Sequence, residues 1–171
     1  MFQMRMTTDA NGFVLFAVET LALALGRPAV EGENLLLAFK RTHLGDQVLN
    51  VGAIVPIYPI TDGTYDVCVR LSTEAKPAFA REAPDARAGT YVLHVARKAV
   101  VGDLAILQEW APEEGWNAVA LPAGFYTAEV FAYRAEPCSG FEIVLSVVDA
   151  LPPVTAEWGT ELDVDNSMND R

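Results

Sequence analysis

A short pattern that occurs three times limits the fold of this chain more than any other feature of its sequence. The pattern is Gly-x-Tyr-x-apolar-x-Val, and its copies span residues 63–69, 89–95 and 124–130. Each copy follows a turn-forming segment in which glycine permits a positive φ. Because alternate side chains of a β-strand point to the same face, the tyrosine and the two apolar residues of each copy share one face. The pattern therefore predicts three strands.

Apolar runs between these copies predict further strands. The runs span residues 13–18, 21–25, 35–39, 48–60, 104–110, 118–121 and 141–148. Residues 13–25 also fit one buried helix, but the alternation of large and small side chains in 20–25 favours a strand. Pro56 and Pro59 make the 48–60 segment either an edge strand or an extended crossing segment. Residues 77–81 fit a short helical turn. We expect an all-β fold, an antiparallel β-sandwich of roughly eight to ten short strands with minor helix, with a closed barrel as the alternative.

The size and composition fit a single folded domain. The chain has 171 residues, of which 51% are hydrophobic and 20% charged, and this excludes disorder for most of its length. Residues 1–153 are expected to form the β-sandwich domain and residues 154–171 a polar acidic tail that frays after Pro152 and Pro153, with few anchors apart from Trp158. The longest apolar run is too short to cross a bilayer and lacks a cleavage pattern. We therefore expect a cytoplasmic protein without membrane contact.

Residues able to perform chemistry are few. Cys68 and Cys138 lie 70 residues apart, which favours two reduced, buried thiols, while one disulfide is the alternative for an exported protein. The only histidines, His43 and His94, fit a loop and an exposed strand position. No nucleophile elbow, phosphate-binding loop or Cys-x-x-Cys pair is present in the sequence. We therefore expect a non-enzyme with no catalytic residue, no cofactor and no metal site.

The charge of the chain is strongly asymmetric. The net charge is −11, and residues 1–100 are balanced, with ten acidic and ten basic side chains. The last 71 residues carry thirteen acidic side chains against Arg134 and Arg171. Such a field disfavours nucleic acid and favours a basic protein partner, since opposite fields accelerate association. An acidic surface that only maintains solubility is the alternative, and the 163–166 segment lacks the glycine and glutamate of an EF-hand calcium loop.

The acidic half of the chain also carries the aromatic side chains that suit a binding surface. Trp110 and Trp116 bracket a loop containing two glutamates, and tryptophan is enriched at the centres of interfaces. Core packing is the alternative for both rings, and a solvent-exposed turn is the alternative to an acid/base pair for the glutamates. The predicted partner-binding residues are Glu109, Trp110, Glu113, Glu114 and Trp116, flanked by Glu129 and Glu136.

One stretch resembles a known family. Residues 119–130, Val-Ala-Leu-Pro-Ala-Gly-Phe-Tyr-Thr-Ala-Glu-Val, lead into a strand, and Phe-Glu-Ile-Val-Leu follows at 141–145. This turn and final strand resemble the competence protein J family of DNA-entry nuclease inhibitors, and also the β-sandwich immunity proteins of bacterial toxin systems. The resemblance covers about a fifth of the chain. It implies a non-enzymatic protein that binds and blocks a nuclease.

Three functions of different classes follow from these observations. The leading hypothesis is an acidic, non-catalytic inhibitor of a basic protein, a nuclease or toxin. The second is a small-ligand or carbohydrate module in which Trp110, Trp116 and tyrosines stack on the ligand. The third is a structural or oligomeric subunit whose edge strands near Pro56 pair between copies.

Overall fold

The structure is a computed structural model that describes residues 1–162 and residue 164. These residues form nine strands in two sheets, four short α-helices and one 3-10 turn. The first sheet has the order β1-β4-β9-β8-β5 and the second the order β3-β2-β6-β7. The strands are β1 (Phe2–Thr8), β2 (Phe13–Ala17), β3 (Ile54–Ile57), β4 (Gly63–Leu71), β5 (Ala86–Val95), β6 (Ala99–Asp103), β7 (Asn117–Val119), β8 (Gly124–Tyr133) and β9 (Gly140–Val148). The prediction of a mostly-β chain is confirmed.

The three copies of the repeated pattern form strands β4, β5 and β8 of the five-stranded sheet, as predicted. Tyr65, Tyr91 and Tyr126 are buried, but each hydroxyl still donates a hydrogen bond to a backbone carbonyl. In β4 and β8 the acceptor lies four residues earlier, which fastens the preceding turn to the strand. This bond explains why the repeat uses tyrosine rather than phenylalanine. The sheet is not wholly antiparallel as expected, because β4 and β9 pair in parallel.

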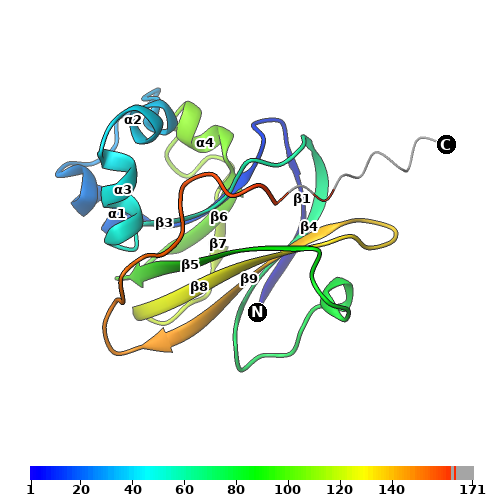
Figure 1. The fold of residues 1–171 in the computed structure, drawn as a ribbon. Coiled ribbons are helices and arrows are strands. Elements are labelled where there is room, and N and C mark those ends of the chain that lie inside the picture. Colours follow the sequence, from blue (N-terminus) through cyan, green and yellow to red (C-terminus); the bar gives the residue numbers. More distant parts are fainter. Residues whose placement is uncertain (163, 165–171) are drawn as a thin grey trace.

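The second sheet is covered on both faces. Every residue of β2 is buried, so its sequence is continuously apolar instead of alternating. Phe13 packs edge-on against Tyr65 of the five-stranded sheet, with ring centroids 6.1 Å apart. Phe16 points the other way, toward Trp110 and Trp116. The helices lie on that outer side, while the five-stranded sheet lies on the opposite side (Figure 1).

Helices replace several predicted strands. The helices are α1 (Val18–Leu25), α2 (Leu35–Arg41), α3 (Leu44–Asn50) and α4 (Ala105–Gln108), and the 3-10 turn is η1 (Ala78–Ala80). The predicted strands at residues 21–25, 35–39 and 104–110 are therefore wrong. In each case a residue at one end of the segment favours a helix. Gly26 ends α1 with a positive φ. The Asn34 side chain caps α2, and the Asp103 side chain accepts from the backbone N–H of Ala105 at the start of α4.

The remaining local predictions have mixed outcomes. The 48–60 segment begins within α3 and continues into β3, which is an edge strand as Pro56 indicated. The helical turn near residues 77–81 is confirmed by η1. Strand β1 was not predicted, although Phe2, Met4 and Met6 alternate with polar residues in its sequence. No helix among the described residues has the length and apolarity that a membrane crossing requires.

The chain after Pro153 packs against the fold along an extended path, which we call the C-terminal strap (residues 154–162 and Val164). Its even-numbered side chains are shielded and its odd-numbered ones exposed, a strand-like alternation. Trp158 stacks on Phe39 of α2 with ring centroids 5.6 Å apart, and Leu162 and Val164 are fully buried. The expectation that this tail frays is therefore wrong for these residues. Residues 163 and 165–171, which include most of the calcium-loop alternative, lie outside the described residues.

Candidate functional site

Five carboxylates from separate parts of the chain line one hollow, which we call the acidic groove. Its volume is about 720 Å³, and no Lys, Arg or His is among the described residues that line it. Ile106 and Trp110 supply apolar lining between the acidic side chains. The carboxylates are those of Asp9, Glu31, Asp103, Glu109 and Glu114. The groove thus combines a negative field with a partly apolar surface.

Short hydrogen bonds hold these segments together. The Asp103 carboxylate accepts from the backbone N–H of Ala105 at 2.7 Å, and from that of Asp9 at 3.2 Å. One side chain therefore starts α4 and fixes the β1–β2 turn beside it. On the other side, the backbone N–H of Trp110 donates to the carbonyl of Glu33. The carbonyl of Trp110 accepts from the backbone N–H of Gly32. Hydrogen bonds therefore join the groove segments in pairs, Asp9 with Asp103 and Gly32 with Trp110.

The groove keeps most of its negative charge uncompensated. The Asp103 carboxyl is partly buried, and this burial raises its pKa above the ordinary value of 3.8. The neighbouring basic residues are engaged elsewhere, since Arg27 pairs with Glu33 and Lys98 pairs with Glu113. None of the five groove carboxylates forms a salt bridge with any described residue.

The predicted loop contributes to the groove only in part. Glu109, Trp110 and Glu114 line it, whereas Glu113 turns toward Lys98, with its carboxylate 3.3 Å from the ammonium group. Trp110 is buried, and its ring meets that of Trp116 at a centroid distance of 5.3 Å. The two tryptophans therefore belong to the packing around Phe16, and Trp110 also forms part of the groove wall.

The two flanking charges lie elsewhere. Glu129 of β8 forms an ion pair with Arg87 of β5 at 2.8 Å. Glu136 lines a different hollow, together with Tyr133 and Cys138. Sequence reasoning missed Asp9, Glu31 and Asp103, which complete the groove. Only Asp103 had a local indication, as an acidic residue placed to cap a helix.

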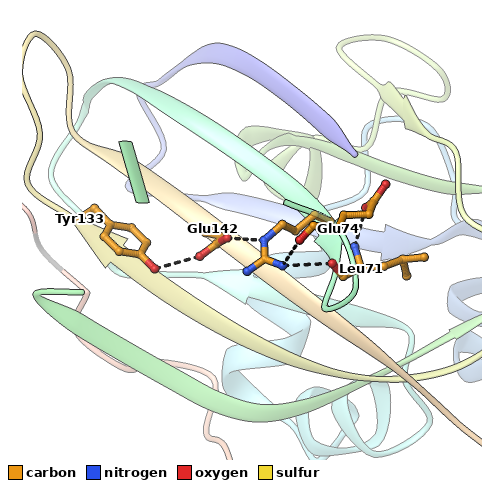
Figure 2. A network of polar contacts seen from close by, with 5 residues as sticks. Leu71, Glu74, Tyr133 and Glu142 are labelled. Carbon is orange, nitrogen blue, oxygen red and sulfur yellow. Dashed lines mark hydrogen bonds and ion pairs between the residues drawn. The ribbon is translucent and has the colours of Figure 1, made fainter. Parts of the chain in front are cut away.

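A second group of polar side chains is buried in the five-stranded sheet, and we call it the buried polar network (Figure 2). The Glu142 carboxylate accepts from the Arg70 guanidinium at 2.5 Å and from the Tyr133 hydroxyl at 2.9 Å. Arg70 also donates to the carbonyls of Leu71 and Glu74. Every member has its partners, so the arrangement fits a structural ion pair rather than a reactive group.

The Cys68 thiol beside this network has low reactivity. Burial, reinforced by the charge of Glu142, raises the pKa of Cys68 to about 12. Cys68 is therefore protonated at neutral pH and is a poor nucleophile. Cys138 is half-buried, and burial raises the pKa of its thiol as well. Within the described residues, no group of three or more His, Cys, Asp or Glu side chains is arranged to hold a metal ion.

Comparison with known proteins gives no relative. No protein family, curated protein or solved structure matches this chain. The resemblance to competence protein J and to immunity proteins therefore rests only on residues 119–130 and 141–145, which form the end of β7, the following turn and the β8–β9 pair. Any function must be argued from the geometry of the chain itself.

Proposed function

We propose that this chain is a non-catalytic, acidic protein of the bacterial cytoplasm that binds and occludes a basic protein, a nuclease or toxin. The observation that carries the proposal is the acidic groove, which five carboxylates line and which has no basic residue in its described lining. Several carboxylates on one surface carry the same sign of charge as the phosphates that a nuclease binds. The negative field would also accelerate association with a cationic surface.

The fold supports this proposal in a general way. We infer that the two sheets, which face each other across Phe13, form a β-sandwich core of the kind found in immunity proteins. Cys68 and Cys138 are free thiols, which fits a reducing compartment. The buried polar network and the high pKa of Cys68 favour binding over chemistry.

The two alternative functions receive less support. A carbohydrate module needs exposed aromatic faces, but Trp110 is buried and Lys98 lies over the ring of Trp116. An oligomer formed through edge strands needs an accessible edge, yet all four residues of β3, including Pro56, are buried. Neither the rings nor this strand is presented to a partner.

The test compares two pairs of substitutions that change the net charge equally. Glu109→Gln with Glu114→Gln removes two charges from the acidic groove, and Glu129→Gln with Glu136→Gln removes two outside it. We expect the groove pair to weaken binding to the product of the adjacent gene about tenfold, and the control pair to change it by less than about twofold. Binding is measured by surface plasmon resonance over a salt series. Equal effects of the two pairs, or an affinity indifferent to salt, would contradict the proposal.

A further inference from the structure

Beside the acidic groove lies a smaller hollow with almost wholly apolar walls, which we call the apolar slot. Helix α1 contributes Val18, Leu21 and Leu25, and the loops opposite contribute Pro28, Trp110 and Pro112. Its volume is about 260 Å³, below the range of about 300 to 1,000 Å³ that pockets for drug-sized ligands occupy. The space suits one large apolar side chain better than a free small molecule.

The slot and the groove are adjoining parts of one surface. Both are walled by the same two segments: Pro28 and Ala29 line the slot, and Glu31 and Gly32 line the groove. Across from them, Trp110 lines both hollows. The two segments are joined by the backbone hydrogen bonds between Trp110 and the 32–33 stretch, so their spacing is fixed.

The charges around the slot favour one kind of side chain beside an apolar group bound in the slot. Arg27 directly precedes the slot residue Pro28, but its guanidinium is held by Glu33 in two hydrogen bonds. The groove side offers the carboxylates of Glu31, Glu109 and Glu114. A ligand whose apolar group enters the slot therefore meets negative charge at once, and charge complementarity requires cations beside its apolar group.

We propose that the apolar slot receives a leucine-sized side chain from a basic segment of the partner protein, while neighbouring arginines or lysines of that segment lie in the acidic groove. This inference rests on the proposed function and adds a sequence preference to it. Burial of the leucine-sized side chain in the slot increases the binding affinity. The cations increase the association rate and orient the segment. A purely basic segment without an anchor binds the groove alone.

The test uses two fluorescent peptides, Arg-Arg-Leu-Arg-Arg and Arg-Arg-Ser-Arg-Arg, and the full chain. We expect the leucine peptide to bind about tenfold more tightly than the serine peptide, as measured by fluorescence anisotropy. Ala22→Phe, which fills the slot from α1, should abolish this ratio. Leu23→Phe places the same ring on the same helix at a side chain that is 74% exposed and outside the slot, and should preserve the ratio.

The outcomes separate the two proposals. If the wild-type chain binds both peptides equally and salt weakens that binding, the proposal that the slot binds leucine is contradicted. The proposal that the acidic groove binds a basic partner is then retained. If neither peptide binds, the proposed function fails and the inference fails with it. Glu109→Gln with Glu114→Gln should weaken both peptides by a similar factor and leave their ratio intact. A ratio that survives Ala22→Phe in a chain with an unchanged melting temperature would also overturn the slot.

Discussion

At the scale of single residues, the shielded tyrosine, aspartate and glutamate side chains follow one rule, in that their polar atoms have defined partners. The indole nitrogens of Trp116 and Trp158 differ, since they are buried without a hydrogen-bond partner among the described residues. The tyrosine hydroxyls of the repeat each reach a backbone carbonyl, and Asp103 joins two segments through its two carboxylate oxygens. The buried polar network follows the same rule, since Glu142 satisfies both Arg70 and Tyr133. Removing one partner should therefore cost more than the bond itself contributes.

Glu142→Gln tests this rule. The substitution leaves the charge of Arg70 buried without its carboxylate, and we expect a loss of about 3 to 5 kcal/mol in the free energy of unfolding, measured with urea. The control is Glu74→Gln, at a side chain that remains about one-third exposed, with an expected loss below about 1 kcal/mol. Similar losses for the two variants would show that the network contributes little.

Asp103 gives a test by pH. Because burial raises its pKa in the folded state, the folded chain retains this proton at pH values where the unfolded chain has lost it. The contribution of Asp103 to the free energy of unfolding therefore falls as the pH rises from the ordinary pKa of 3.8 through the raised pKa of the folded state. Asp103→Asn keeps the acceptor for Ala105 but lacks this titration. The wild type should lose stability relative to the variant over this range in urea titrations, and a relative gain would contradict the assignment.

At the scale of elements, the sequence predicts those whose pattern is long or repeated. Strands β4, β5 and β8 follow from the spacing of glycine, tyrosine and valine. Helices α1 and α2 do not, because an apolar run of five or six residues fits a strand and a buried helix equally. Their capping residues, Gly26 and Asn34, were the available indications.

Only the part of the candidate site that lies within one loop was predictable from the sequence. Glu109 and Glu114 come from one loop, and their neighbourhood to Trp110 is visible in the sequence. Asp9 and Asp103 are separated by 94 residues and meet only because β2 and β6 pair, which no local pattern encodes. Glu129, which the sequence predicts as a flanking charge, is paired with Arg87 in the five-stranded sheet.

The C-terminal strap provides the test at this scale. Trp158→Ala removes the stack on Phe39, and we expect a loss of about 2 kcal/mol, below the range for fully buried tryptophans since this ring is partly exposed. Limited proteolysis should show faster cleavage near residue 158 at the same time. Glu157→Ala is the matched control, because that side chain is exposed and its carbonyl still accepts from Tyr91. Equal behaviour of the two variants would mean that the strap is not anchored by Trp158.

At the scale of the whole molecule, the distribution of charge along the sequence differs from its distribution in space. The excess of acidic residues belongs to the last 71 residues, but Glu142 is buried, and Glu113 and Glu129 are paired with basic residues. The acidic groove draws instead on both halves of the chain. The fold therefore decides which carboxylates share one surface, and the position of an acidic residue along the sequence does not.

The most direct test of this account maps where a cation binds. The full chain, labelled with ¹⁵N, is titrated with tetra-arginine, and the shifts of its backbone amide resonances are followed. We expect the largest shifts at Asp9, Glu31, Glu109 and Glu114, and we expect added salt to suppress them. Largest shifts around Glu129, Glu136 or Asp149, or shifts spread evenly over the acidic residues, would contradict the account.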